Sequence, residues 1–319
     1  NELALRLVRA HTGSKGIVTL DHGYHGNTTG AVDISAYKFN ATGGVGQPDW
    51  VELIELPDDY RGRFKRHDPK RAEKFGDLIN PAIANLMSKR HGLAGFIAET
   101  FPSVAGQIIP PDGYLKNIYK HIRTAGGLCV ADEVQTGLGR LGEYYFGFEQ
   151  QRVEPDIVVL GKPIGNGHPI GVVITTKEIA ESFAQGPEFF STFGGSTLSC
   201  LIGKEVLEII DEENLQNNAK LMGKKLLNGL KEIQNNFSQI GDVRGMGLFC
   251  GVDLVKNIDT REEDSDLCRY IKNRMRDNRI LMGSDGAKDN VLKIRPPLTI
   301  DEEGIDMILS CLQKIMKEI

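Results

Sequence analysis

Two residues with complementary chemistry follow two short apolar segments of this sequence. Residues 128–131 and 157–160 are runs of apolar side chains, too short for helices but long enough for buried strands of a parallel sheet. Asp132 follows the first run directly, and Lys162 follows the second after one glycine. Ligands of open α/β sheets bind outside the carboxyl ends of the strands, so a carboxylate and an amine are expected to face one crevice.

The expected surroundings of Lys162 determine what its amine can do. Poor solvation at the end of an apolar strand disfavours the ammonium form and makes a nucleophilic free amine accessible. Such a lysine can form a Schiff base with pyridoxal 5'-phosphate, and Asp132 can supply the carboxylate that this cofactor needs beside its ring nitrogen. An isolated lysine at a strand end is usually a solvated surface group. The pairing with an aspartate and the glycines around the lysine favour the cofactor interpretation, these glycines being Gly161, Gly165 and Gly167.

The same stretches carry a resemblance to a known family. ADEVQTGLGR at 131–140 and GKPIGNGHP at 161–169 resemble the core of the class III (subgroup II) pyridoxal-phosphate aminotransferases, and the resemblance extends over nearly the whole chain. Within that family, DHGYHG, DISAYKF, ETFPSVAGQIIPPDGYL and DVRGMGLF are most similar to the branch that contains ethanolamine-phosphate phospho-lyase and phosphohydroxylysine lyase. The resemblance implies an α/β protein of fold type I.

That fold type implies a large domain with a mostly parallel sheet and a small carboxyl-terminal α+β domain. We expect the cofactor-binding domain to cover 1–212 and the smaller domain to cover 213–319. The predicted strands are 16–20, 93–98, 128–131, 157–160, 170–175 and 291–294, and the predicted helices are 68–91, 111–124, 177–184, 197–213, 215–237, 266–278 and 301–319. A long loop is expected over 41–68, and one strand broken by glycines over 241–249.

The resemblance also assigns residues to the cofactor. It implies that Tyr24 stacks on the pyridine ring with His25 beside it, and that Val134 lies against the opposite ring face. Gln135 and Glu99 match family residues near the phenolic oxygen of the cofactor. Two structural alternatives stay open: a tyrosine that packs its loop onto the sheet, and a glutamate held in a salt bridge at a strand end.

Two further residues concern the phosphate and the substrate. Thr192 lies in a cluster of Ser, Thr and Gly that suits an anion, and by resemblance it binds the cofactor phosphate of the neighbouring subunit, which implies a homodimer. The alternative is a polar turn before a helix. Arg295 can hold a carboxylate or phosphate through two parallel hydrogen bonds. In the aminotransferases the matching arginine holds the α-carboxylate, whereas the animal phospho-lyases are associated with lysine there. A surface arginine held rigid by Pro296 and Pro297 is the alternative.

Composition restricts the partners of the chain. Of the 319 residues, 40% are hydrophobic, and the net charge is −5 with acids and bases mixed along the sequence. No basic region favours a nucleic acid, and no apolar run reaches the roughly 20 residues of a membrane span. The five cysteines are scattered without a CxxC pair, which signals neither disulfides nor a metal site and fits a reducing cytoplasm. Small molecules and a second copy of the chain are the expected partners.

The first residue of the chain has a bearing on the phosphate site. Asn1 resembles the last residue of a Gly-Ser-Glu-Ala-Asn run in the family, whose earlier members help to bind the cofactor phosphate. We therefore expect that loop, and the amino-terminal part of the family chain before it, to be absent. A catalytically inactive fragment or relative is one consequence to test.

One motif points to a different cofactor. Residues 137–142 match G-x-G-x-x-G, the dinucleotide-binding pattern. That pattern opens directly into a helix, whereas residues 143–147 are an aromatic stretch ending in glycine. A nicotinamide enzyme is therefore not favoured.

Two reactions remain open for a pyridoxal-phosphate enzyme with these residues. Lys162 would act as the general base, and transfer of the amino group from an amine or amino acid to a 2-oxo acid is the first interpretation. Elimination of phosphate from an O-phosphorylated amino alcohol such as phosphoethanolamine is the second. The branch resemblance favours the phospho-lyase, and Arg295 favours a substrate with a carboxylate.

Overall fold

The computed structural model describes all residues from 1 to 319 and divides them into two compact units. Unit 1 consists of Asn1–Thr100, Pro110–Gly137 and Gly147–Glu208. Unit 2 consists of Phe101–Ile109, Leu138–Phe146 and Ile209–Ile319. We call Phe101–Ile109 the first excursion and Leu138–Phe146 the second excursion, because each leaves unit 1, joins unit 2 and returns. The functional division at residue 212 stays a prediction.

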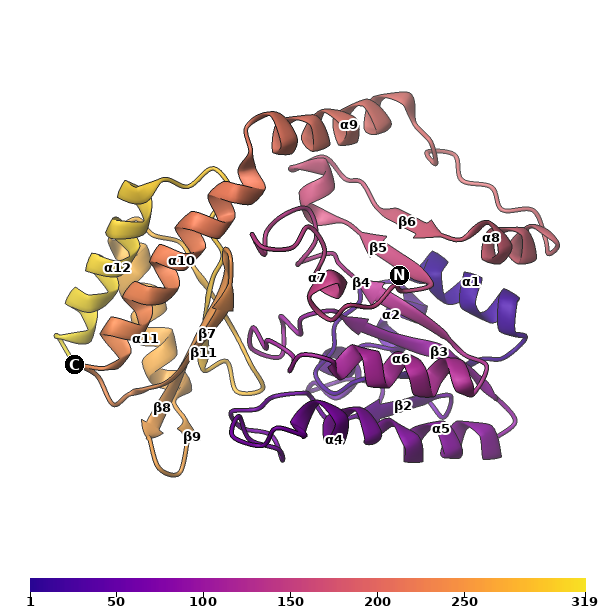
Figure 1. The fold of residues 1–319 in the computed structure, drawn as a ribbon, viewed down its shortest axis with the longest axis horizontal. Helices are drawn as coiled ribbons and strands as arrows, with labels where there is room; N and C mark the ends of the chain where they lie inside the picture. Colours follow the sequence, from indigo (N-terminus) through magenta and orange to yellow (C-terminus); the bar gives the residue numbers. More distant parts are fainter. The chain divides into compact units, whose positions relative to one another are not determined.

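A six-stranded sheet with the order β2-β1-β3-β4-β5-β6 forms the centre of unit 1 (Figure 1). Its strands are β1 (Gly16–Leu20), β2 (Val51–Ile54), β3 (Leu93–Glu99), β4 (Leu128–Asp132), β5 (Ile157–Leu160) and β6 (Val172–Thr175). Neighbouring strands are parallel, except that β6 runs antiparallel to β5. The side chains of β1, β3 and β5 are all buried, as expected for a sheet covered on both faces.

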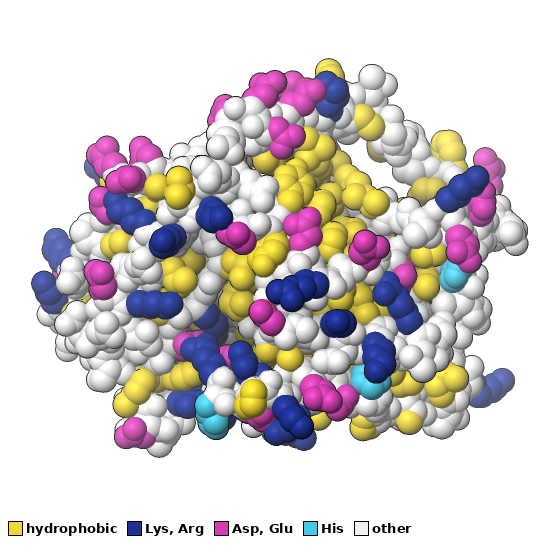
Figure 2. All heavy atoms as spheres, in the orientation of Figure 1, with side chains coloured by type: hydrophobic (Ala, Val, Ile, Leu, Met, Phe, Trp, Pro, Cys, Tyr) yellow, Lys and Arg dark blue, Asp and Glu magenta, His cyan; other side chains and the backbone are white.

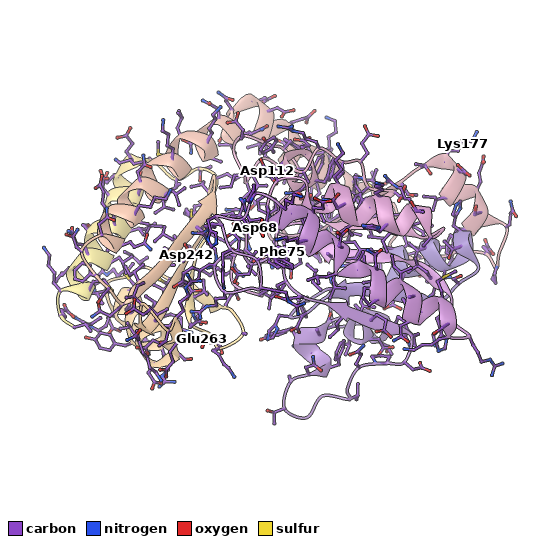
Figure 3. All side chains as sticks on the ribbon, turned by 60° about the horizontal axis from the view of Figure 1, so that its bottom comes forward. Asp68, Phe75, Asp112, Lys177, Asp242 and Glu263 are labelled. Atoms are coloured by element: carbon purple, nitrogen blue, oxygen red, sulfur yellow. The ribbon has the colours of Figure 1, made fainter.

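Helices cover both faces of this sheet. Successive side chains of a strand point to opposite faces, so Ile17 packs in one apolar cluster and Val18 in another. The first cluster includes residues of α1 (Glu2–Thr12) and α8 (Lys177–Ala184), and the second includes residues of α4 (Arg71–Asp77), α5 (Ile79–Ser88) and α6 (Tyr114–Thr124). Phe75 of α4, which is labelled in Figure 3, is fully buried in the second cluster. The remaining helical segments of unit 1 are α2 (Thr29–Asp33), α3 (Ala36–Phe39), α7 (Gly147–Gln150) and the 3₁₀ helix η1 (Lys162–Gly165).

Unit 2 is an antiparallel sheet with helices packed against its apolar face. The strands are β7 (Ile240–Met246), β8 (Phe249–Asn257), β9 (Glu262–Glu263), β10 (Gly283–Asp285) and β11 (Val291–Ile294), with β10-β11-β8-β7 as the main order. The helices are α10 (Leu215–Gln234), α11 (Ser265–Asp277) and α12 (Glu302–Met316), and α9 (Thr197–Glu212) spans the boundary between the units. All three of α10, α11 and α12 contribute to one apolar core, with residues such as Leu226, Ile271 and Leu312. None of the helices combines the length and apolar character that crossing a bilayer requires.

A buried charge network holds the first excursion to the sheet of unit 2. Asp242 of β7 (labelled in Figure 3) and Asp253 of β8 are directly opposite each other, an unfavourable arrangement for two carboxylates. The guanidinium of Arg244 donates to both, at 3.0 and 3.2 Å. Its Nε and Nη2 also donate to the carbonyl oxygen of Gly106, at 2.9 and 2.7 Å. The arginine thus offsets the repulsion between the two carboxylates and fixes the excursion.

Three of the sequence predictions need correction. The expected loop over 41–68 contains β2, which forms because it pairs with β1 at the sheet edge. The expected helix over 68–91 is divided into α4 and α5, because Pro81 has no amide hydrogen to donate to Asp77, and the Asn80 side chain donates to that carbonyl instead. The expected single strand over 241–249 is the β7–β8 hairpin, with Gly247 at φ 53° in its turn.

Two glycines of α10 provide a matched stability test. A Cβ at Gly223 would lie 2.2 Å from the backbone carbon of Gly247, whereas a Cβ at Gly229 would meet the side-chain end of Leu309. Because backbone atoms cannot move aside, we expect Gly223→Ala to lower the free energy of unfolding by about 1–3 kcal/mol. Gly229→Ala is expected to cost less, because the Leu309 side chain can rotate and alanine favours the helix by about 0.5–1 kcal/mol. Equal losses in urea unfolding would contradict the close helix–turn contact.

Candidate active site

The carboxyl ends of three neighbouring strands carry the central predicted residues. Glu99 and Asp132 are the last residues of β3 and β4, and they are paired in register. Asp132 is also opposite Val159 of β5, and Lys162 follows that strand after Gly161. The predicted juxtaposition of two parallel strand ends is therefore present, with Glu99 on the adjacent strand.

Lys162 occupies a special backbone position. It is the first residue of η1, with φ 41°, a region that costs a residue with a Cβ on the order of 1–3 kcal/mol and is often found at functional sites. Lys162 is solvent-exposed, so the poor solvation that the sequence predicted is not found in this chain. The physical reason is that the lysine does not end the buried strand but begins a turn beyond it. Its reactivity must therefore depend on what binds around it.

Asp132 is buried and held by three donors. His25 Nδ1 and Asn1 Nδ2 donate to its Oδ2 at 2.8 and 2.7 Å, and the backbone N–H of Val134 donates to Oδ1 at 3.1 Å. Burial opposes ionisation of this carboxyl, but the hydrogen bonds and the charge of His25 outweigh it and hold the pKa of Asp132 below its ordinary value. Asp132 is therefore a carboxylate at neutral pH.

This carboxylate fits the ring nitrogen of pyridoxal phosphate. An ionised carboxyl group has about four acceptor positions, and three of those of Asp132 are used within the chain. One position is left for an N–H donor, and a fixed negative charge beside a ring nitrogen keeps that nitrogen protonated. The second ring nitrogen of His25 contacts the Thr19 hydroxyl at 3.3 Å, which fixes the imidazole next to Asp132.

Four other predicted residues lie near these strand ends in sequence or by contact. Gln135 donates to Glu99 through a long hydrogen bond of 3.4 Å, and both side chains are buried. Val134 lies beside Gly161, the residue that precedes Lys162. A Cβ at Gly161 would be 3.4 Å from Cγ1 of Val134. Tyr24 packs edge-on against another tyrosine ring and remains partly exposed.

Thr192 and Arg295 are placed elsewhere in the chain. Thr192 lies in an exposed stretch between α8 and α9. Arg295 follows β11 in unit 2, where its guanidinium lies 5.5 Å from the ring centroid of Phe249. It is partly buried.

The sequence prediction missed two contributors to the site. Asn1 was noted only for its place in the family, yet its amide is a direct donor to Asp132. Glu133 is 1% exposed and accepts hydrogen bonds from the backbone N–H groups of Gly147 and Phe148. Burial raises its pKa although these donors oppose the shift. Glu133 thus holds the point where the second excursion returns to unit 1, a role that no local sequence pattern reveals.

No group of three or more His, Cys, Asp or Glu side chains is arranged to hold a metal ion. The five cysteines are all free, and burial raises the pKa of Cys250 and of Cys268 to about 12. These thiols therefore stay protonated at neutral pH and are poor nucleophiles.

Comparison with known proteins shows which family the chain belongs to. The family model for aminotransferase class-III matches residues 1–316. The alanine--glyoxylate aminotransferase 2-like protein of Drosophila melanogaster is 43% identical over 327 residues, covering 100% of this chain and 66% of that protein. Ethanolamine-phosphate phospho-lyase homolog 1 of Caenorhabditis elegans is 38% identical, covering 99% of this chain and 70% of that protein.

The comparison with solved structures also finds proteins of this family. The structure of a phospholyase from Arthrobacter in complex with phosphoethanolamine has a TM-score of 0.93 and 36% sequence identity, and it covers 100% of this chain and 75% of that chain. The fold is therefore that of the fold type I pyridoxal-phosphate enzymes. The chain belongs to the class III aminotransferase family, whose cofactor is pyridoxal phosphate. It spans about two thirds of the length of the curated relatives that it matches.

His25→Phe tests how the buried carboxylate is held. Removing the Nδ1 donor leaves Oδ2 of Asp132 with one donor fewer, so we expect the free energy of unfolding at pH 7 to fall by about 1–3 kcal/mol. The lowered pKa of Asp132 contributes stability above the unfolded pKa of about 3.9, and this contribution disappears as the pH falls through the folded pKa. Without His25 the folded pKa rises, so the loss begins at higher pH.

The matched control is His121→Phe. His121 also contacts an aspartate, but both side chains are partly exposed, so this change should alter stability by less than about 0.5 kcal/mol. Urea unfolding between pH 3 and pH 7 compares the variants. A loss in His25→Phe as small as that of the control would contradict the central role of this hydrogen bond.

Proposed function

We propose that the chain functions as a pyridoxal-phosphate-dependent aminotransferase that moves an amino group from an amine or amino acid to a 2-oxo acid. The observation that carries the proposal is the pair of neighbouring parallel strand ends that present Asp132 and, one glycine beyond the strand, Lys162. Family membership supports it, because the class III family is named for this reaction.

Several residues of unit 1 would hold the cofactor. Lys162 would bind it covalently through Nζ, and Asp132 would bind its ring nitrogen. Tyr24 and Val134 would enclose the ring with His25 beside it, and Glu99 and Gln135 would lie near the phenolic oxygen. The hydrogen bond from Gln135 to Glu99 supports the last assignment, because it places the two residues together. We propose that 1–212 is the cofactor-binding domain and 213–319 the smaller domain.

The residues divide the chemistry between them. The bound cofactor supplies an electron-accepting ring that stabilises the negative charge left when a substrate carbon loses its proton. Asp132 remains ionised and keeps a proton on the ring nitrogen. Lys162 Nζ would be freed when the substrate amino group replaces it on the cofactor. As general base it would then take the proton from the carbon that bears the substrate amino group and would deliver a proton to the cofactor carbon, which completes the transfer of the amino group. Arg295 would bind a carboxylate of the substrate through two parallel hydrogen bonds.

Elimination of phosphate from an O-phosphorylated amino alcohol is the second candidate function. The likeness to the Arthrobacter phospholyase and to the phospho-lyase homolog of Caenorhabditis elegans favours it. The same Lys162 and Asp132 would serve both reactions, since both begin with loss of a proton. In the elimination, the electron pair left after proton loss would form a carbon–carbon double bond, and the neighbouring carbon–oxygen bond would break so that phosphate leaves with its bonding electrons.

We also propose that two copies of the chain form a homodimer in the cytoplasm, with Thr192 contributing to the neighbouring active site. The stretch around Thr192 exposes large apolar side chains, namely Phe190, Phe193, Leu198 and Leu201, each at least 59% accessible. Figure 2 shows hydrophobic atoms at the surface next to α9. Clustered apolar side chains of this kind mark interaction surfaces. Free, scattered cysteines fit a reducing compartment.

Lys162→Ala tests the proposed catalytic base. We expect borohydride reduction of the cofactor-treated protein to attach the cofactor mass to Lys162, and to attach none in the variant. Loss of the base should lower the rate by about 10²–10⁴-fold. Lys116→Ala, at an exposed lysine of α6, is the control and should change neither result. Attachment of cofactor at another lysine would refute the assignment.

The two reactions are separated by their products in the same assay. An amino acid with pyruvate should yield a new 2-oxo acid in the aminotransferase case. Release of inorganic phosphate from O-phosphoethanolamine without any 2-oxo acid would instead establish the phospho-lyase. Absence of both reactions, together with no cofactor on Lys162, would indicate an inactive fragment or relative.

Phe193→Glu tests the proposed dimer surface. Phe193 is 84% exposed in the single chain, so a glutamate at this position would be solvated there. Its charge would be buried, at a cost in free energy, only where a second copy covers the surface. We expect the wild-type chain to sediment as a dimer and the variant to dissociate at concentrations at least about 10-fold higher. Leu281→Glu is the control, since Leu281 is 85% exposed in unit 2, away from this stretch of sequence. Equal dimerisation of both variants would contradict the assignment of the surface.

A further inference from the structure

The guanidinium of Arg295 rests on an aromatic support to which both excursions contribute. Its carbon lies 5.5 Å from the ring centroid of Phe249, which is fully buried. The Phe249 ring packs edge-on against Phe101 of the first excursion, with centroids 6.0 Å apart, and shares an apolar cluster with Leu141 of the second excursion. The position of Arg295 therefore depends on chain segments that lie between the strands of unit 1 in sequence.

Arg140 of the second excursion fixes the backbone next to Arg295. Its Nη1 donates to the carbonyl oxygen of Pro296 at 2.9 Å and to that of Leu248 at 3.1 Å. The backbone N–H of Leu248 donates in return to the carbonyl oxygen of Arg140 at 3.0 Å. One side chain thus joins the excursion, the β7–β8 turn and the residue that follows Arg295.

The second excursion is itself firmly seated in unit 2. A Cβ at Gly247 would lie 2.4 Å from the backbone carbon of Leu141, so the turn and the excursion are in direct backbone contact. Gln216 of α10 donates to the carbonyl oxygen of Gly142 at 3.1 Å. Because the excursion cannot shift easily, Arg140 provides a rigid point of attachment.

Electrostatics give Arg140 a second effect. Its side-chain partners are neutral carbonyl groups, and burial together with the neighbouring charge of Arg295 lowers its pKa to about 10. Arg140 therefore remains a cation at neutral pH, and its charge lies close to that of another guanidinium. Two adjacent cations attract an anion more strongly than either alone.

We propose that Arg140 is a positioning residue for Arg295 and that the two guanidiniums together form the subsite for the anionic group of the substrate. The role of Arg295 as substrate anchor rests on the proposed function. Arg140 holds the Pro296 carbonyl, so it determines where the Arg295 side chain begins, and its charge strengthens the attraction for a carboxylate or phosphate. The short stretch 133–139 connects this positioning residue to the strand that ends at Asp132.

Three substitutions separate the contributions of Arg140. Arg140→Met removes both the donors and the charge, Arg140→Lys keeps the charge and a single donating nitrogen, and Arg140→Gln keeps a donating nitrogen without the charge. Arg276→Met is the matched control, because Arg276 is an exposed arginine of α11 that forms an ion pair with its neighbour Asp277. Circular dichroism and urea unfolding first establish that each variant is folded, and the lysine and glutamine variants test the proposal if the methionine variant does not fold.

The first measurement needs no cofactor. In hydrogen–deuterium exchange, peptides covering 291–300 should exchange about 10-fold faster in Arg140→Met than in the wild-type chain, because the charge-assisted hydrogen bond to the Pro296 carbonyl is lost. Isothermal titration with inorganic phosphate should show weaker binding in the same variant. Unchanged exchange and unchanged phosphate binding would overturn the proposal, whether or not the chain is an enzyme.

The second measurement uses the loaded enzyme and compares substrates with and without an anionic group. For L-alanine and O-phosphoethanolamine we expect KM to rise about 10–100-fold in Arg140→Met, with partial rescue in Arg140→Lys. For 2-phenylethylamine, an amine that carries no carboxylate or phosphate group, KM should change less than about threefold. An equal loss for all three substrates would show a merely structural role and overturn the proposal. Lack of activity in the wild-type chain would refute the proposed function instead, and exchange and phosphate binding would still decide the role of Arg140.

Discussion

Parallel pairing of β3, β4 and β5 is the constraint on which the candidate site depends. Parallel strands place their carboxyl ends at one edge of the sheet, so Glu99, Asp132 and the chain that leads to Lys162 must meet there. The strands themselves are buried between two layers of helices, which leaves this edge as the place where polar side chains can emerge. The chemistry of the site follows from this geometry and from a carboxylate kept ionised by its donors.

Two segments that follow strands of this sheet, the first and second excursions, belong to unit 2. Each leaves unit 1 shortly after a strand end, one after β3 and one after β4, and each is built into the other unit. Arg244 fixes the first excursion through the carbonyl oxygen of Gly106, and Arg140 joins the second to the turn before Phe249.

Sequence patterns predicted the strands better than they predicted their surroundings. Gly16–Leu20 and Ile157–Leu160 are found at their predicted bounds, because short apolar runs next to glycines and charged residues are a local signal. The strand Val51–Ile54 lacks such a signal and forms only through its pairing with β1. Likewise, local pattern suggested a poorly solvated Lys162, whereas the turn after β5 carries it into solvent.

The sequence by itself determined the fold class, the family and the candidate pair of Asp132 and Lys162, because all of these depend on local patterns and motifs. Only the tertiary structure decided which groups surround Asp132, since His25 and Asn1 are 107 and 131 positions away along the chain. It also decided that Arg140 supports the backbone beside Arg295. Contacts between residues so far apart leave no periodicity or spacing in the sequence, and they arise only when each unit folds and brings its segments together.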